Sequence, residues 1–393
     1  MLFSEVFVSQ YLKDILKNTV KNKRISHAQL FLGQQGTHSL GLAIAYCQYI
    51  ACQNRTETDA CGHCPSCVKF NNLTHPDLHF FFPNFSPEKK TYSSLDYYEQ
   101  WRNLLKSNNA LISFQQWVET IDAGNKQLQI NVRDSAVLLD QMIMKPYESE
   151  YKFFIIWLPE KMNIDCANKL LKTLEEPDGK TLLILVAEDY DSILGTILSR
   201  TQLLKINKLP LEEFIDVVSK HVECEKSIAS EIASLTDCNL QQALHLGMNI
   251  VDGDNFQLFC SMMRCAYRLA YFANKIDKTD FDTADTTIRE LVTLGREKQK
   301  NFLTYSLNLI RKCVLLSCNA EQLVKMPDQE DKWVHDFAPF VNATNGHYMV
   351  EAFNNALNDI AKNGNPMIVF TDLLFLIGQI IRVGDPRLNR KNA

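Results

Sequence analysis

The chain has 393 residues, of which 46% are hydrophobic and 22% are charged, and its formal net charge is −5. The length corresponds to two or three domains of about 150 residues, and the 14 glycines and 12 prolines are too few for a collagen-like or disordered chain. A protein that wraps nucleic acid is usually basic, so we expect any contact with DNA to be local or shared with partner chains. The unusual number is the twelve cysteines.

The N-terminal segment 5–23 is predicted to be an amphipathic helix, because apolar residues recur on one side of it. This stripe comprises Val6, Tyr11, Leu12, Ile15, Leu16 and Val20. The segment lacks the basic start, long apolar run and cleavage site of a signal peptide. The most apolar stretch, Met367–Ile381, is too short for a membrane span and contains Asp372. We therefore expect a cytoplasmic chain with no membrane contact.

The next segment has the strand–loop–helix layout of a phosphate-binding loop. A short apolar strand before Gly33 leads into a helix that begins at Ser39 and ends at Cys52. A working loop needs a lysine to reach the β- and γ-phosphates and a hydroxyl to hold Mg²⁺. Gly33 and Gly36 are present, but Ser39 stands at the lysine position and Leu40 at the hydroxyl position. The sequence therefore keeps the layout and lacks the nucleotide chemistry.

Four cysteines, Cys52, Cys61, Cys64 and Cys67, form a C-x8-C-x2-C-x2-C cluster. A dense cluster in a cytosolic chain indicates a metal more than disulfides. Four thiolates complete a tetrahedral zinc site without an open position, which favours a structural role. Two disulfides or an iron–sulfur cluster remain alternatives. The other eight cysteines are expected to be small buried hydrophobes.

Strands and helices alternate as far as residue 205, which predicts an α/β domain over 1–205 with a mostly parallel sheet. Further strands are expected at 75–83, 151–159 and 181–189, and a helix is expected at 163–177. Segment 130–148 is expected to be a strand end followed by an amphipathic helix, and segment 197–206 ends the region. Residues 84–129 resemble an insertion with one or two extra helices. A small helical domain is expected over 206–250 and an all-α domain over 251–393, because helical periodicity persists there with little strand character.

The order of these motifs resembles the clamp-loader subunits of bacterial DNA polymerase III, a branch of the AAA+ ATPases. The resemblance rests on segments 24–36, 75–83, 167–177 and 197–200, together with the cysteine cluster at about 52–67. It implies an AAA+-like P-loop domain with an inserted zinc module, a helical lid at 206–250 and a C-terminal oligomerisation (collar) domain at 251–393. It further implies gamma/tau-type ATPase subunits, a delta-type clamp-opening subunit, the sliding clamp and primed double-stranded DNA as partners.

Several positions depart from the ATPase members of that family. Where those members end a strand in Asp-Glu, this chain has Trp157 and Leu158, which can neither position Mg²⁺ nor activate water. The expected polar sensor falls at Ala187 or Glu188, and the arginine of the small helical unit falls at Gln241. The resemblance therefore implies a non-catalytic stator subunit that does not itself hydrolyse ATP.

One nucleotide-handling residue of the family is retained. The family's Ser-Arg-Cys motif projects its arginine into the nucleotide site of the neighbouring subunit, and here Ser199 and Arg200 are followed by threonine. The resemblance implies that Arg200 is an arginine finger in trans, a role that contributes roughly 10³ to 10⁵ in rate. The alternative is an ordinary surface arginine at the start of a strand.

The charged residues of LLKTLEEP form a second open question. Lys172, Glu175 and Glu176 lie at i, i+3 and i+4 on one face of the predicted helix. They could pair with one another, pair with a neighbour, or form a solvated charged face.

Two other functions compete with the stator. An active gamma/tau-type ATPase would need a lysine at position 39 and a hydroxyl at position 40. A stand-alone zinc nucleic-acid-binding module is disfavoured by the acidic net charge and by the large α/β frame.

Overall fold

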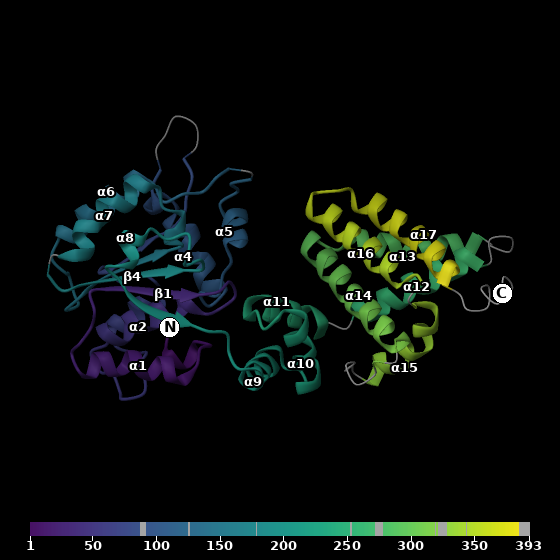
Figure 1. Cartoon of the computed structure of the whole chain (residues 1–393), viewed down its shortest axis with the longest axis horizontal. Coiled ribbons are helices and arrows are strands. Elements are labelled where there is room, and N and C mark those ends of the chain that lie inside the picture. The colour runs from purple at the N-terminus through teal and green to yellow at the C-terminus, as the bar shows by residue number, and fades with distance from the viewer. Residues whose placement is uncertain are drawn as a thin grey trace. The chain divides into compact units, whose positions relative to one another are not determined.

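The structure is a computed structural model that describes residues 1–86, 92–124, 126–177, 179–251, 254–271, 278–318, 320, 328–342 and 344–384. Residues 87–91 and 125 of the expected insertion lie outside these described residues, as do 252–253, 272–277, 319, 321–327, 343 and 385–393 of the expected C-terminal domain. The chain divides into two units (Figure 1). The first comprises Met1–Glu213 with Cys238–Gln242, and the second comprises Phe214–Asp237 with Ala243–Ala393.

The first unit is built on a five-stranded sheet with the order β2-β3-β4-β1-β5. Every neighbouring pair in this sheet is parallel, which confirms the α/β class expected from the sequence. The strands are β1 (Ala28–Gly33), β2 (Leu78–Phe81), β3 (Lys152–Trp157), β4 (Thr181–Ala187) and β5 (Gln202–Ile206). From β1 the chain crosses to the edge strand β2, steps back through β3 and β4, and then passes over β1 to form the other edge, β5.

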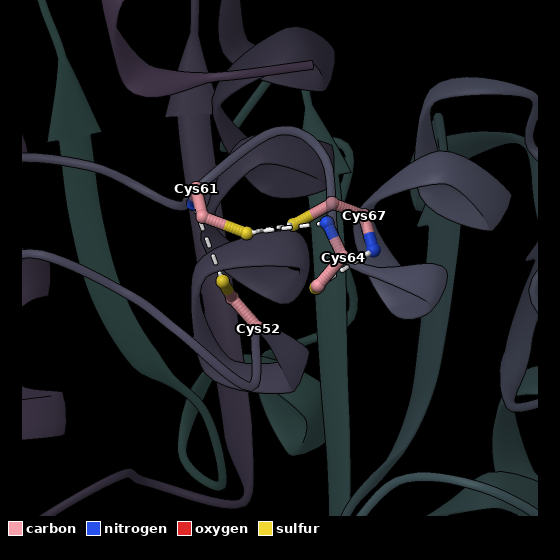
Figure 2. Close-up of side chains that lie close together, drawn as sticks. All are labelled: Cys52, Cys61, Cys64 and Cys67. Atoms are coloured by element: carbon pink, nitrogen blue, oxygen red, sulfur yellow. Dashed lines mark hydrogen bonds between the residues drawn. The ribbon is translucent and has the colours of Figure 1, made fainter.

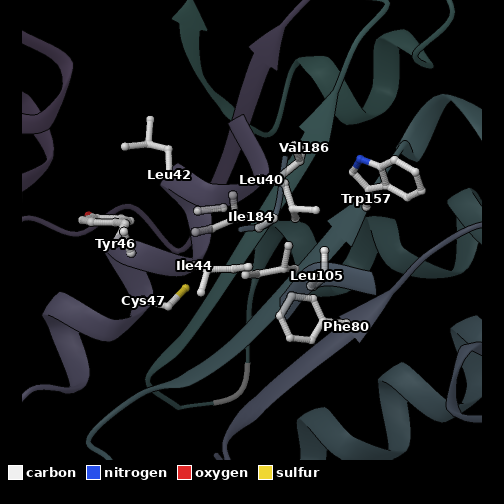
Figure 3. Packing of buried hydrophobic residues seen from close by; sticks show 14 of the residues in the cluster. Leu40, Leu42, Ile44, Tyr46, Cys47, Phe80, Leu105, Trp157, Ile184 and Val186 are labelled. Carbon is white, nitrogen blue, oxygen red and sulfur yellow. The ribbon is translucent and has the colours of Figure 1, made fainter. Parts of the chain in front are cut away.

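Helices cover both faces of this sheet, because successive strand residues point to opposite sides. Phe153, Ile155 and Trp157 of β3 belong to the core under α2 (Ser39–Ala51), while Phe154 and Ile156 belong to the opposite core. On the first side lie also α1 (Gln10–Lys21), α3 (Pro65–Asn71), α4 (Tyr98–Ser107) and α5 (Phe114–Thr120). On the second side lie α6 (Val132–Ile143), α7 (Ile164–Glu175) and α8 (Gly195–Leu198). Figure 3 shows the first core.

The predicted N-terminal helix over 5–23 is too long at its start. A short 3₁₀ turn, η1 (Phe3–Glu5), comes first, and α1 begins only after Ser9, whose extended backbone makes it the N-cap. Leu12 and Val20 are buried as expected, but Tyr11 is 73% exposed and does not belong to the apolar stripe. The stripe predicted from the sequence is therefore wrong at Tyr11, because the position of this residue on the helix turns its ring to solvent.

The segment between β2 and β3 contributes aromatic packing to the first core. It contains η2 (Ser94–Tyr97), α4 and α5 among its described elements. The ring of Trp101 stacks on Phe82 with centroids 4.2 Å apart, and Trp117 meets Phe82 edge-on at 4.9 Å. These contacts attach the segment to the edge of the sheet where β2 ends.

The described elements of the second unit are helical. They are α9 (Leu211–Val222), which begins at the end of the first unit, and α10 (Lys226–Leu235), α11 (Leu240–Val251), α12 (Asp254–Tyr271), α13 (Lys278–Thr293), α14 (Arg296–Ser317), α15 (Asp328–Phe337), η5 (Ala338–Phe340), α16 (Gly346–Ala361) and α17 (Pro366–Gly384). Phe353, Leu373 and Leu374 lie in the core of the α12–α17 bundle. Within the part of the chain that is described, no helix combines the length and the apolarity needed to cross a bilayer.

Candidate functional site

The four cysteines of the cluster come from the end of α2, the following loop and the start of α3. Cys52 is the C-cap of α2, and Cys64 is the N-cap of α3. Their sulfur atoms all lie within 4.8 Å of one another. Figure 2 shows the four side chains arranged around a common point. Three of these cysteines are buried and Cys61 is half-buried.

The geometry of this cluster suits a metal ion. Backbone N–H groups of Cys61 and Cys64 donate to the sulfurs of Cys52 and Cys61, both at 3.3 Å, and such donors stabilise thiolates. The sulfurs of Cys61 and Cys67 are 3.9 Å apart. Zinc–sulfur bonds of about 2.3 Å in a tetrahedron place sulfurs about 3.8 Å apart. No disulfide joins any of the twelve cysteines, all of which are described. The donor set therefore fits zinc in a closed four-thiolate site.

The loop of the cluster is attached to the N-terminal segment. The carboxylate of Asp59 accepts hydrogen bonds from the backbone N–H groups of Phe3 and Ser4, both at 2.9 Å. The hydroxyl of Tyr49, on α2, donates to the carbonyl of Thr56 at 2.9 Å. An ion held by the four sulfurs would therefore fix the relative positions of α2, α3 and the start of the chain.

The loop after β1 is filled by its own side chains. Thr37 Oγ1 and Ser39 Oγ are hydrogen-bonded at 2.8 Å, and Thr37 Oγ1 also donates to the carbonyl of Gln34 at 2.7 Å. A Cβ at Gly33 would lie 2.1 Å from Ser39 Oγ, so only glycine fits there. Ser39 and Leu40 are each only 4% exposed. Figure 3 shows Leu40 among the core residues near Val186.

His38 stands just before the lysine position, where a phosphate-binding loop has a glycine. The side chain of His38 is completely buried. The N–H of Phe7 donates to its Nδ1 at 3.1 Å, so Nε2 carries the proton and donates to the carbonyl of Asn109 at 2.7 Å. Burial lowers the pKa of His38 to about 4, which keeps the ring neutral. The histidine therefore connects the loop to the N-terminal segment and to the residues after α4 in place of a nucleotide contact.

The segment Cys238–Gln242 of the first unit lies against the outside of the same loop. Gly36 has a φ of +85°, and a Cβ there would lie 2.0 Å from Asn239 Oδ1. Gln241, at the position of the family's arginine, donates from Nε2 to Gln116 Oε1 at 2.7 Å. The neutral amide of Gln241 thus takes the place of that arginine and is bonded within the chain.

The carboxyl ends of β3 and β4 also lack the residues of a nucleotide site. Trp157 ends β3 with its ring centroid 5.1 Å from that of Trp101, and Leu158 is buried with a φ of +55°. Glu160 follows and accepts the N–H of Glu188 at 3.0 Å. Burial, with Glu160 alongside, raises the pKa of Glu188 to about 7. The structure thus places the Glu160 carboxylate against the backbone of Glu188, where the carboxyl ends of β3 and β4 are adjacent.

Arg200 lies at the other end of the sheet layer, just after α8, where Ser199 is the C-cap. Its Nε donates to Glu175 Oε1 at 2.6 Å, and its Nη1 donates to Ser199 Oγ at 3.1 Å. The arginine side chain is 32% exposed. Ser199 and Arg200, the two residues predicted from the sequence, both lie at the surface of the first unit. Arg200 forms an ion pair within the chain.

Comparison with known proteins identifies the family. Residues 8–210, just over half of the chain, match the family described as DNA polymerase III, delta subunit. The chain belongs to this family. The matched region contains the degenerate loop, the cysteine cluster and Arg200, whereas Asn239 and Gln241 lie beyond its end.

Relatives of this delta-family chain resemble parts of it that range from 44 to 76% of its length. The delta-prime subunit of Bacillus subtilis is 26% identical over 60% of this chain and 58% of its own length. The delta-prime subunit of Pseudomonas aeruginosa is 29% identical over 44% of this chain and 41% of its own length. The tau subunit of B. subtilis is 23% identical over 76% of this chain and 47% of its own length. The chain thus spans about half the length of these curated relatives. The family match and the two delta-prime relatives together show that it resembles the delta-prime subunit.

Among solved structures, a DNA polymerase III gamma subunit-related protein of Thermotoga maritima aligns over 94% of this delta-family chain and 99% of its own, with 13% identity and a TM-score of 0.36. The B. subtilis DNA clamp loader delta protein aligns over 94% and 99% with 12% identity and a TM-score of 0.33.

Sequence reasoning missed two contacts in this delta-family chain. It left the partner of Glu175 open, and it did not anticipate that Glu160 bonds to Glu188. The first pair is separated by 25 residues and the second by 28. A periodic pattern reports neighbours on one helix, so neither pair produces a local signal. The order of parallel strands could have indicated the second pair, because the carboxyl ends of β3 and β4 are adjacent.

Proposed function

We propose that this chain is a non-catalytic stator subunit of a DNA polymerase III clamp loader. In this role it completes a ring with gamma/tau-type ATPase subunits and a delta-type clamp-opening subunit. The complex then loads the sliding clamp onto primed double-stranded DNA in chromosomal replication. The chain acts in the cytoplasm and meets both ATP and DNA through the ring.

The observation that carries this proposal is the filled loop after β1. The hydroxyls of Thr37 and Ser39 bond to each other, and Leu40 belongs to the hydrophobic core. A serine supplies no positive charge for the β- and γ-phosphates, and a leucine cannot hold Mg²⁺. Trp157 likewise stands in aromatic packing where the ATPase members have an acid. These residues favour a subunit that leaves hydrolysis to its neighbours.

Four parts of the chain have supporting roles in this proposal. The four cysteines hold a structural Zn²⁺ that fixes α2 against α3. Residues 206–250 form a helical lid domain, and residues 251–393 form the collar domain through which the subunits assemble. The α/β domain over 1–205 presents Arg200 to the neighbouring ATPase subunit.

Arg200 gives the proposal its sharpest test. We expect Arg200→Ala to slow ATP hydrolysis by the clamp- and DNA-stimulated complex, because the guanidinium stabilises charge on the transferring γ-phosphoryl group. The measurement uses complexes whose ATPase subunits carry alanine at their own finger arginines, so that the remaining activity reports the site that Arg200 serves. At that site, the rate of ATP hydrolysis is expected to fall about 10³-fold or more.

Assembly is the control for this experiment. Gel filtration of the Arg200→Ala complex is expected to give the wild-type elution volume, because the side chain is partly exposed and belongs to none of the hydrophobic cores. Arg200→Lys keeps the charge and loses the planar fork, so it is expected to restore only part of the rate. An Arg200→Ala complex that assembles and hydrolyses ATP at the wild-type rate would refute the finger role.

A further inference from the structure

The guanidinium of Arg200 is held by a carboxylate of its own chain. Nε donates to Glu175 Oε1 at 2.6 Å, and Nη2 forms an ion pair with the same oxygen. The arginine comes from the residues after α8 and the glutamate is the last residue of α7. The pair therefore connects two elements that are 25 residues apart in the chain.

The opposite side of the guanidinium is held as well. Nη1 donates to the carbonyl of Thr196 at 3.0 Å and to Ser199 Oγ at 3.1 Å. Together with the Glu175 contacts, these bonds engage all three nitrogens and fix the plane of the group. A planar fork held on two sides has one orientation, whereas a free arginine samples many rotamers.

The surroundings favour a cation at this point. The C-terminal end of α7 carries partial negative charge from its last carbonyl groups, which stabilises a nearby positive side chain. His27 Nε2 contacts the carbonyl of Leu174 at 2.8 Å and so helps to fix this end of α7. The side chains of Arg200 and Glu175 remain 32% and 51% exposed, so a partner can reach them.

We propose that Glu175 is the positioning residue for Arg200. It orients the guanidinium toward the neighbouring subunit before that subunit's nucleotide arrives. Exposed ion pairs contribute little to stability, so the consequence of this pair lies in orientation. The inference rests on the proposed role of Arg200 as a finger in trans, and it names the residue of this chain on which that role depends.

The neighbouring Glu176 provides a matched control. It lies one residue beyond the end of α7, its side chain is exposed, and its N–H donates to the carbonyl of Lys172 at 3.0 Å. Glu175→Gln and Glu176→Gln change the net charge equally. Only Glu175→Gln removes the carboxylate that faces Arg200.

The first experiment uses the isolated full-length chain and needs no partner. Arginine Nε–Hε correlations in the NMR spectrum report the bond from Arg200, assigned by its loss in Arg200→Lys. Glu175→Gln is expected to shift this signal and to speed its exchange with water by about tenfold or more, while Glu176→Gln leaves it in place. An unchanged signal in Glu175→Gln would overturn the inference.

The second experiment measures ATP hydrolysis by the reconstituted complex with the other finger arginines replaced, as above. Glu175→Gln is expected to lower kcat by about 10- to 100-fold with little change in KM, because a misplaced catalytic group costs rate more than substrate binding. Glu175→Asp is expected to recover part of kcat, and Glu176→Gln to behave as wild type. Glu175→Gln combined with Arg200→Ala is expected to be no slower than Arg200→Ala alone.

The outcomes separate this inference from the proposed function. If Arg200→Ala has no effect, the finger role and the positioning role fail together. If Arg200→Ala is slow but Glu175→Gln is as fast as wild type or faster, the finger role stands and the positioning role is wrong. A slow Glu175→Gln complex whose defect adds to that of Arg200→Ala would also overturn positioning, because the two residues would then act independently.

Discussion

Ser39 and Leu40 stand where a nucleotide-binding loop places its lysine and its hydroxyl, and both are nearly inaccessible. Their identity alone removes the charge and the Mg²⁺ ligand, so the loss of this chemistry could be predicted from the sequence. The contacts that fill the loop in place of a nucleotide could not be predicted from the sequence. The bond between Thr37 and Ser39 and the buried ring of His38 become visible only once the loop is folded.

If the cysteine cluster is a zinc site, replacing a single cysteine has a predictable effect. Cys64→Ser is expected to reduce the zinc content of the purified chain from about one ion to near zero, because a structural site needs all four thiolates. The first unit is expected to lose about 4 kcal/mol of unfolding free energy, the stabilisation from a ligand at about 1,000 times its dissociation constant. Metal analysis and denaturant titration check the two values.

The matched control for the cluster is Cys318→Ser. Cys318, the C-cap of α14, is exposed, so the expectation of a buried cysteine is wrong at this position. It lies far along the chain from the cluster. It is expected to keep both the zinc content and the stability of the wild type. Full zinc content in Cys64→Ser would contradict a four-thiolate site.

Among the helices, α2 shows most directly how an element of the nucleotide-binding layout has become a structural one. Its residues from Ser39 to Ile50 are all buried, which is typical of a helix enclosed on every side. Its N-terminus, which in a phosphate-binding loop points at an anion, begins here after the buried His38. The apolar sequence of α2 indicated a buried helix, but the neighbours that enclose it, such as Phe3 and Leu16, come from the N-terminal segment.

The buried ring at the start of α2 predicts a pH dependence. The pKa of His38 is lowered to about 4 in the folded chain from 6.5. The unfolded chain therefore binds this proton first as the pH falls below 6.5, and the stabilisation present above that pH is lost toward pH 4. Between pH 7 and 4.5 this histidine is expected to account for about 2 kcal/mol of the lost unfolding free energy.

His38→Gln tests this contribution, because an amide can accept from the N–H of Phe7 and donate to the carbonyl of Asn109. The variant is expected to lose less stability on acidification than the wild type, as followed by the fluorescence of buried Trp101 and Trp117. His347→Gln, in the second unit, serves as the control. An equal loss of stability in His38→Gln and wild type would show that the ring does not stay neutral.

Taken as one chain, the protein consists of an α/β unit and a helical unit with separate hydrophobic cores. The helical unit contains a buried ion pair, in which Lys312 Nζ contacts Glu330 Oε2 at 3.2 Å, and Tyr305 donates to Glu330 Oε1 at 2.5 Å. Removing one member of a buried pair leaves the other charge without compensation. This contact joins α14 to α15 and belongs to the second unit alone.

Glu330→Ala is expected to destabilise the helical unit by about 3 kcal/mol and to leave the transition of the α/β unit unchanged. Far-ultraviolet circular dichroism follows the helices. In a Trp333→Phe background, which removes the tryptophan of the second unit, fluorescence follows the transition of the first unit. Asp331→Ala, which removes an exposed contact with His335, is the control and is expected to shift neither transition. A common shift of both transitions in Glu330→Ala would show that the two units unfold together.

The features that the sequence by itself determined are those whose signal lies within a few consecutive residues. The spacing of four cysteines, the alternation of buried strands with helices, and the missing lysine and hydroxyl after β1 are all local patterns, because side-chain identity and short-range periodicity set them. The tertiary structure decided the contacts between distant segments. Glu175 meets Arg200 at one end of the sheet layer, and Glu160 meets Glu188 at the other, because parallel crossovers bring the ends of separate strands and helices together at each end. No pattern along the chain encodes such a meeting, since it depends on how the layers pack.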